Sequence, residues 1–139
     1  MLGLDEYQKH AKTFDVTPDL FKMIIERLLE HGATVDVEAE KDTDIKIGRF
    51  LRLNYYLHGL SGEVGEISNK FKKIQRDSDG IMSEKMREDF ADELGDVMWY
   101  MSRLADLLGF SLGDICQGNL SKLADRKERG VLKGSGDNR

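Results

Sequence analysis

Two long stretches of this chain, residues 46–76 and 83–108, carry apolar residues at steps of three and four. This spacing is that of one face of an α-helix. The two stripes consist of Phe50, Leu53, Leu57, Leu60, Val64, Ile67, Phe71 and Ile74, and of Met86, Phe90, Leu94, Val97, Met101, Leu104 and Leu108. The single proline, Pro18, precedes both stretches, so neither helix needs to break. We therefore expect two long antiparallel helices that pack along their stripes.

Signals for helix ends divide the rest of the chain. Thr17, Ser83 and Ser111 each precede a helical pattern and are expected to be N-caps. Gly32 and Gly109 follow such patterns and are expected to end helices. Shorter helices are thus predicted over residues 4–14, 17–30 and 111–130.

The predicted fold is an all-α bundle of four to five helices in a single domain, residues 1–139. Residues 33–44, which are acidic and alternate weakly, are expected to form a loop, and residues 131–139 a flexible tail. Of all residues, 40% are apolar and 34% charged, which fits a soluble helical protein. A single cysteine, Cys116, fits a reducing cytoplasm. From the sequence we expect neither a membrane span nor a signal peptide.

Each long helix carries a pair of acids three residues apart: Glu63 and Glu66 on the first, Glu93 and Asp96 on the second. Residues three apart are only about 60° apart around a helix, so each pair can hold one cation. An isolated Glu-x-x-Glu is usually part of a solvated face. Here the motif occurs twice, in the same relation to the apolar stripe, and contains no basic residue. We therefore expect the four carboxylates to form one site.

The metal that suits these acids follows from what surrounds them. None of the histidines, His10, His31 and His58, lies three residues after a glutamate, so the signature of di-iron bundles is absent. Carboxylates without histidine or cysteine favour hard cations, Mg²⁺ first and Mn²⁺ as the other possibility. The net charge of −5 argues against a nucleic-acid partner, but it is compatible with a small phosphorylated ligand.

Two residues near the acids are further candidates. Lys70 lies four residues after Glu66 on the same helix face and is suited to contact phosphate. Tyr100 lies one turn after Asp96 and is suited to bond a carboxylate or a ligand. The chain also has a basic tail after residue 121. This tail could either close over a phosphorylated ligand or be a frayed end.

The stretch from Leu60 to Arg103, followed by Asn119 to Arg126, resembles the MazG-like, all-α nucleoside triphosphate pyrophosphohydrolases. Their mark is Glu-x-x-Glu on one helix and Glu-x-x-Asp on the next, as in the two acidic pairs of this chain. Some relatives have two adjacent glutamates at the start of the first motif, where this chain has Gly62 before Glu63. Residues 17–47 have no counterpart in the resemblance.

The resemblance implies hydrolysis of a nucleoside or deoxynucleoside triphosphate to the monophosphate and pyrophosphate. It implies Mg²⁺ held by the four acids, with Glu63 or Glu66 helping to take a proton from water. It also suggests substrate contacts from Lys70, Tyr100, Asn119, Lys122 and Arg126. Family members usually form dimers or tetramers, so a homo-oligomer is expected.

Two alternatives remain open on the sequence. One is a pyrophosphohydrolase of narrower role that acts on dCTP, dUTP or phosphoribosyl-ATP. The other is a helical homo-oligomer without catalytic activity, whose acids serve solubility or bind a structural metal.

Overall fold

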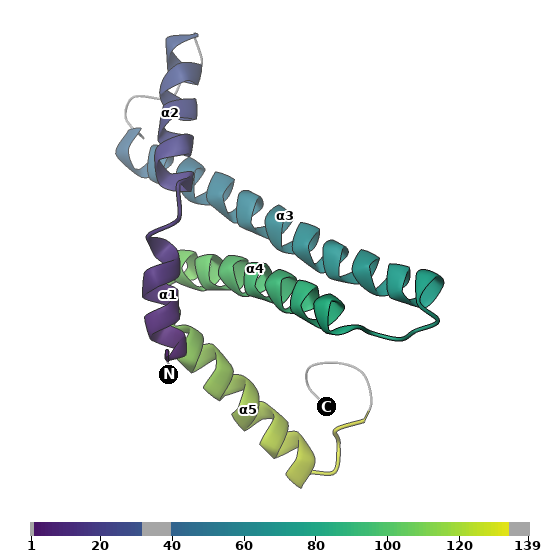
Figure 1. The fold of residues 1–139 in the computed structure, drawn as a ribbon. Coiled ribbons are helices and arrows are strands. Elements are labelled where there is room, and N and C mark those ends of the chain that lie inside the picture. Colours follow the sequence, from purple (N-terminus) through teal and green to yellow (C-terminus); the bar gives the residue numbers. More distant parts are fainter. Residues whose placement is uncertain (1, 32–39, 134–139) are drawn as a thin grey trace.

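The computed structural model describes residues 2–31 and 40–133, with the backbone alone for residues 40–47. Figure 1 shows the helices, which are α1 (Leu4–Lys12), α2 (Thr17–Glu30), α3 (Glu40–Asp77), α4 (Glu84–Leu108) and α5 (Leu112–Glu128). The described residues contain no strand, so the all-α prediction is confirmed. No described helix has the combined length and apolar character that a membrane span needs.

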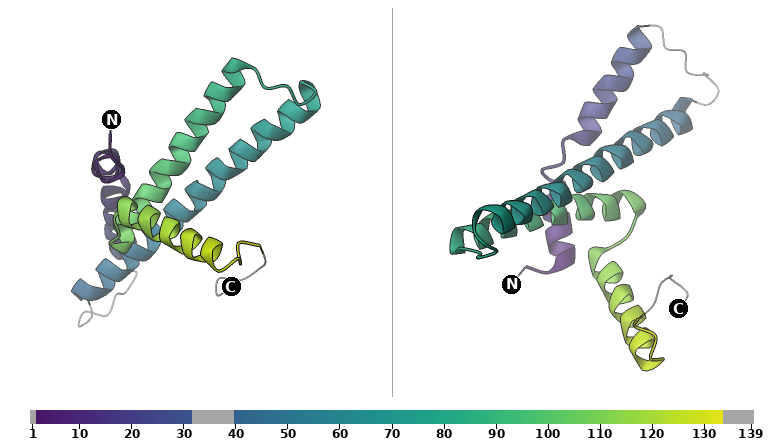
Figure 2. Two further views of the ribbon diagram at one scale, coloured as in Figure 1. Left: turned by 90° about the horizontal axis from the view of Figure 1, so that it is seen from below. Right: turned by 90° about the vertical axis from the view of Figure 1, so that its right-hand side faces the viewer.

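Helices α3 and α4 form a long hairpin and lie side by side in all views (Figures 1 and 2). The other three helices gather at the end of the hairpin that lies away from its loop. There α1 packs against α4 and α2 packs against the first part of α3. Helix α5 begins beside α1 and then leads away from the hairpin (Figure 2). The acidic motifs of α3 and α4 therefore face one another across the hairpin.

The apolar stripe of each long helix divides into two rows. On α3, a row at seven-residue intervals, Leu53, Leu60, Ile67 and Ile74, is buried or half-buried. The second row is exposed, and so is a row on α4. We call these exposed residues together the bare apolar face: Phe50, Leu57, Val64, Phe71, Leu94, Met101 and Leu108. The expectation that the whole stripe packs inward is therefore wrong for the single chain, because contact with one neighbouring helix buries only one row.

The two rows lie on a definite side of the hairpin. Residues four apart on a helix are about 40° apart around its axis. In both helices the exposed row follows the buried row by four residues. The acids lie on the other side of the buried row. In an antiparallel pair, equal rotations place both exposed rows on one side of the hairpin. One side is therefore apolar and the other acidic.

The predicted caps are confirmed at three helix ends. The hydroxyl of Ser83 accepts a hydrogen bond from the Met86 amide at 3.2 Å, and that of Ser111 accepts one from the Asp114 amide at 3.2 Å. Gly109 ends α4 with φ at +80°, a conformation that favours glycine.

Thr17 departs from its predicted role. The N-cap position of α2 belongs to Val16, and Thr17 is the first helical residue. Its hydroxyl lies 2.7 Å from both Asp15 Oδ1 and Tyr56 Oη. The prediction of Thr17 as N-cap is wrong because this side chain serves a tertiary contact instead.

The predicted loop over residues 33–44 is also partly wrong. Residues 33–39 and Gly32 lie outside the described residues, but residues 40–44 already belong to α3. The alternation of apolar and polar residues in this short acidic stretch was only weak evidence for a loop, and the long helix that follows extends into it. At the other end, α5 stops at Glu128, and residues 131–133 are not helical.

Helix α1 joins the hairpin to α5 through buried polar groups. The Arg103 side chain, 1% exposed, donates to the Gln8 carbonyl oxygen at 2.8 Å. The Gln8 amide nitrogen donates to the Phe110 carbonyl at 2.9 Å, and its oxygen accepts from the Leu112 amide at 2.9 Å. Trp99 adds a bond from its indole nitrogen to the Ala11 carbonyl at 3.2 Å. The α4–α5 turn is thus fixed to α1, on the acidic side of α4.

Candidate active site

Three of the predicted acids meet between α3 and α4. Glu63 and Glu66 of α3 and Glu93 of α4 each offer a carboxylate oxygen, and these oxygens all lie within 4.8 Å of one another. Of these residues Glu93 is buried, Glu63 half-buried and Glu66 exposed. Two turns from different helices therefore build one cluster, as the spacing of the motifs predicts.

Asp96 stands beside this cluster without joining it at that distance. Its charge nevertheless reaches Glu63, whose pKa is raised by burial first, and then by Asp96, Glu66 and Glu93. A hydrogen bond between Glu63 and Glu93 raises the pKa of Glu63 further. The other three acids thus all act on Glu63, with Asp96 at the edge of the cluster.

Such a cluster of carboxylates carries an electrostatic cost of its own. Like charges that approach closely disfavour ionisation, and a bound cation relieves this repulsion. Carboxylate oxygens alone suit a hard cation such as Mg²⁺. The donor set of Glu63, Glu66 and Glu93 therefore fits a divalent metal on chemical grounds.

Lys70 contacts the cluster from α3. Its Nζ lies 2.7 Å from Glu93 Oε1 and donates to the Asp89 carbonyl at 2.7 Å. The hydrogen bond to Glu93 is the main cause that raises the pKa of Lys70. Spacing along the sequence relates Lys70 to Glu66, but its partner is the acid on the opposite helix. Lys70 thus lies at the site, bridging the two helices.

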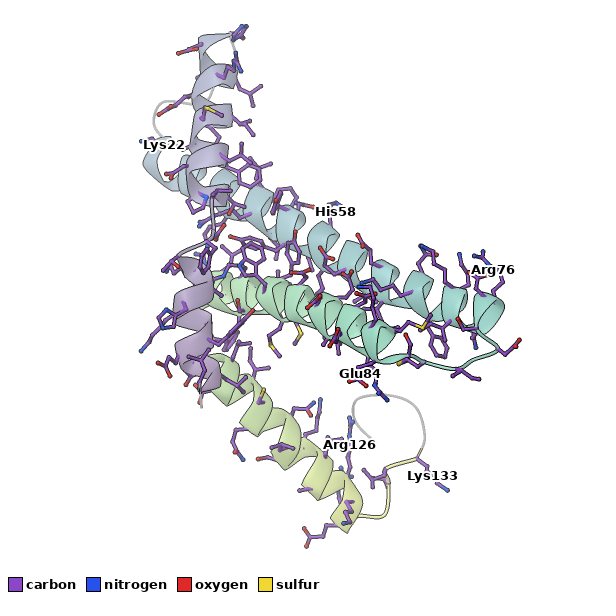
Figure 3. All side chains as sticks on the ribbon, in the orientation of Figure 1. Lys22, His58, Arg76, Glu84, Arg126 and Lys133 are labelled. Atoms are coloured by element: carbon purple, nitrogen blue, oxygen red, sulfur yellow. The ribbon has the colours of Figure 1, made fainter. Side chains whose placement is uncertain are left out.

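A cavity of about 370 Å³ lies beyond Lys70, toward the hairpin loop. It is lined by Lys70, Lys73, Ile74, Asp77, Ser78, Met86, Asp89 and Phe90. Its charged lining is mixed, with two lysines from α3 and one aspartate from each helix. Figure 3 shows this part of the hairpin, where Arg76 and Glu84 are labelled.

Tyr100 lies on the other side of the acids. Its ring crosses α3 at Gly59, where a Cβ would come within 2.2 Å of the ring. Burial, a hydrogen bond and charge interaction with Tyr55, and the charges of Glu63 and Asp96 all raise the pKa of Tyr100. The structure therefore brings this predicted residue next to the acids.

Two further tyrosines share this environment. Tyr55 of α3 interacts with Tyr100, and Tyr7 of α1 has its pKa raised by burial and then by Asp96. Neither is part of an acidic motif. The pairing of α1 with α4 brings in Tyr7. For Tyr55, the helical spacing to Gly59 and Glu63 was a signal that could have marked it.

The remaining candidates, Asn119, Lys122 and Arg126, lie on α5. This helix has α1 as its main packing partner and leads away from the hairpin (Figure 3, where Arg126 is labelled). Arg126 is buried, at 6% exposure. Within one chain, the structure does not bring these residues to the acids.

The comparisons with known proteins bear on this site. The MazG nucleotide pyrophosphohydrolase domain matches residues 52–131. The Gene 37 protein of Mycobacterium phage L5 is 55% identical over 87 residues, which are 63% of this chain and 76% of the phage protein. No solved structure matches. Since the domain match spans more than half of the chain and includes both acidic pairs, the chain belongs to the MazG nucleotide pyrophosphohydrolase family.

Proposed function

We propose that this protein hydrolyses nucleoside and deoxynucleoside triphosphates to the monophosphate and pyrophosphate in the presence of Mg²⁺. The observation that carries the proposal is the meeting of Glu63, Glu66 and Glu93 within 4.8 Å across two helices. These residues lie inside the stretch that matches the pyrophosphohydrolase domain. Asp96 is proposed as a fourth acid of the same site.

Glu63, Glu66, Glu93 and Asp96 would hold the metal. When bound, Mg²⁺ supplies charge neutralisation for the phosphates and makes water a better nucleophile. Glu63 is proposed to take the proton from the attacking water, with Glu66 as the other candidate. Its place in the cluster supports this role, because a carboxylate oxygen of Glu63 lies within 4.8 Å of those of Glu66 and Glu93.

Lys70 is proposed to stabilise charge on the pyrophosphate. In the structure its Nζ neutralises Glu93 at 2.7 Å. This ammonium is therefore close enough to the acids to contact a phosphate oxygen of a nucleotide bound there, where its positive charge would stabilise the leaving pyrophosphate.

We also propose that the chain forms a homodimer or homotetramer. The bare apolar face supports this, since its residues form regular rows along both long helices. Asn119, Lys122 and Arg126 are proposed to contribute substrate contacts in that assembly, because in a single chain α5 leads away from the acids.

The function is tested by pyrophosphate release from a panel of ribo- and deoxynucleoside triphosphates, with phosphoribosyl-ATP included, with and without Mg²⁺. We expect metal-dependent release, and we expect Glu63→Gln and Asp96→Asn each to lower kcat/KM by about a hundredfold or more. Glu88→Gln, an exposed acid on α4 outside the motifs, is the matched control and should retain activity.

The outcome also separates the alternatives. Turnover of dCTP, dUTP or phosphoribosyl-ATP alone would identify the narrower enzyme. Metal-dependent turnover that both variants retain would exclude the acid cluster as the active site. If the folded wild type releases no pyrophosphate from any member of the panel, the catalytic proposal is wrong, and a helical homo-oligomer without activity becomes the better description.

A further inference from the structure

Aromatic side chains flank the acid cluster on the side nearest α1. Tyr7 of α1, Tyr55 of α3 and Tyr100 of α4 come from three different helices, and we call them the tyrosine patch. Tyr55 and Tyr100 interact with each other, and the charge of Asp96 raises the pKa of both Tyr7 and Tyr100. The Tyr100 ring also lies against α3 at Gly59, four residues before Glu63. The patch therefore lies near the acids.

The position of the Tyr100 ring is held by its surroundings. A Cβ at Gly59 would lie 2.2 Å from its Cε1 and Cζ atoms and 2.7 Å from its hydroxyl oxygen, so only glycine leaves room for the ring. Trp99 packs edge-on against it, with ring centroids 4.9 Å apart and an interplanar angle of 89°. By contrast, a Cβ at Gly62 would meet no atom within 4 Å.

Tyr55 combines a fixed ring with an exposed surface. Phe21 and Tyr56 pack against it edge-on, at centroid distances of 6.1 and 6.0 Å. It nevertheless remains 41% exposed. An aromatic side chain that is held by two neighbours but open to solvent is suited to stack on a flat ligand.

Tyrosines, acids and lysines follow one another along the hairpin. Tyr55 precedes Glu63 by eight residues, or about 12 Å along the helix, and Lys70 follows Glu63 by seven. Phenols thus lie on one side of the acids, and lysines with the cavity lie on the other. A nucleotide has a matching polarity, with an uncharged nucleoside at one end and phosphates at the other.

We propose that the tyrosine patch binds the nucleoside end of the substrate, with the Tyr55 ring as stacking surface and the Tyr100 hydroxyl as hydrogen-bonding group. Gly59 is then a positioning residue, because it gives the Tyr100 ring its place. The phosphates point toward Lys70 and the metal-binding acids. This inference rests on the proposed function and identifies which residues select the base and sugar.

Product inhibition measures the two ends of the substrate separately. We expect Tyr55→Ala to raise the inhibition constant of deoxynucleoside monophosphates about tenfold, the loss typical of one base–aromatic stack, and Tyr55→Phe to change it much less. The inhibition constant of inorganic pyrophosphate should stay within about twofold. Tyr56→Phe is the matched control, since this neighbouring tyrosine is buried and belongs to a structural contact.

A binding measurement separates this inference from the proposed function. Trp99 is the single tryptophan and touches Tyr100, so its fluorescence can report deoxynucleoside monophosphates added with Mg²⁺. Monophosphate binding that weakens in Tyr55→Ala supports the patch even if no triphosphate is hydrolysed. Normal turnover, inhibition constants and fluorescence response in Tyr55→Ala would overturn the patch and leave the proposed function standing.

A mutant cycle tests the role of Gly59. Gly59→Ala should weaken monophosphate binding in the wild type but have no further effect when Tyr100→Ala is already present. Gly62→Ala, on the same helix but with open space around it, should bind normally. Equal effects of the two glycine variants, or full additivity of Gly59→Ala with Tyr100→Ala, would show that Gly59 does not act through Tyr100.

Discussion

Glu63 is the side chain on which the neighbouring charges converge. Burial, Asp96, Glu66 and Glu93 all raise its pKa. A carboxyl whose pKa is higher in the folded than in the unfolded state binds its proton more tightly when folded. Folding is therefore favoured at low pH, and this contribution is lost as the pH rises through the folded pKa. Glu63 is suited to metal binding at a cost in stability to the metal-free protein.

Glu63→Gln should consequently stabilise the metal-free protein at neutral pH. Below the ordinary pKa of 4.5 the variant and the wild type should melt alike, and above the folded pKa the variant should melt higher. Addition of Mg²⁺ should raise the melting temperature of the wild type and have a smaller effect on the variant. Thermal melts in EDTA and in Mg²⁺ across this pH range measure both. A lower melting temperature for the metal-free variant at neutral pH would contradict the prediction.

Tyr56 differs from Glu63, because its hydroxyl stabilises the fold and has no role in the candidate site. It is 2% exposed and donates a hydrogen bond to Asp15. Burial and this bond raise the pKa of Tyr56 to about 12. The stability contribution is complete below pH 10, the ordinary value for tyrosine, and is lost as the pH rises toward 12.

Tyr56→Phe should lower the free energy of unfolding by about 2 kcal/mol, because Asp15 loses a buried donor. Between pH 10 and 12 the wild type should lose more stability than the variant. Urea unfolding at neutral and alkaline pH gives both values, and tyrosinate absorbance should show one group fewer that titrates late. An identical alkaline loss in the two proteins would show that Tyr56 is not responsible.

At the level of helices, much could be predicted from the sequence. The steps of three and four identified α3 and α4, and local chemistry set three helix ends: Ser83 and Gly109 at the two ends of α4, and Ser111 at the start of α5. The pairing of α1 with α4 and α5 could not be predicted. It depends on Gln8 and Arg103, and polar residues buried by distant contacts look like ordinary surface residues in a sequence.

Gln8→Leu should therefore weaken the junction of α1 with α5. The substitution leaves the Leu112 amide and the Phe110 carbonyl without their partner, which should cost about 2 kcal/mol of unfolding free energy. Hydrogen exchange should rise at the start of α5. Gln117→Leu replaces an exposed glutamine on α5 and is the matched control. It should change neither the unfolding free energy nor the hydrogen exchange by much. Equal effects of the two variants would contradict the assigned role of Gln8.

For the whole molecule, the hairpin presents two unlike sides. The acids, the tyrosine patch and α1 lie on one side, and the bare apolar face lies on the other. From the sequence, the residues of both rows of each stripe have the same spacing, so the row that meets the neighbouring helix could not be distinguished from the row that stays exposed. The acid cluster was predictable because acids three apart share a helix face, and the helical spacing of Tyr55 to Glu63 was a further signal, whereas Tyr7 comes near Asp96 only through the packing of α1 on α4.

The bare apolar face leads to a last prediction, about assembly. Leu57 and Met101 lie on it, 46% and 41% exposed, and neither is an acid-site residue. If two chains pair through this face, Leu57→Lys or Met101→Lys buries an uncompensated charge at the interface and should shift the protein toward monomers. Light scattering over a range of concentrations measures this shift.

The melting temperature of the wild type should rise with concentration, since assembly stabilises the fold. Ile81→Lys, at an apolar residue 73% exposed in the hairpin loop, is the matched control and should leave the assembly intact. A wild type that stays monomeric and folded at all concentrations would exclude pairing, whereas an oligomer unaffected by both lysine variants would place the interface elsewhere.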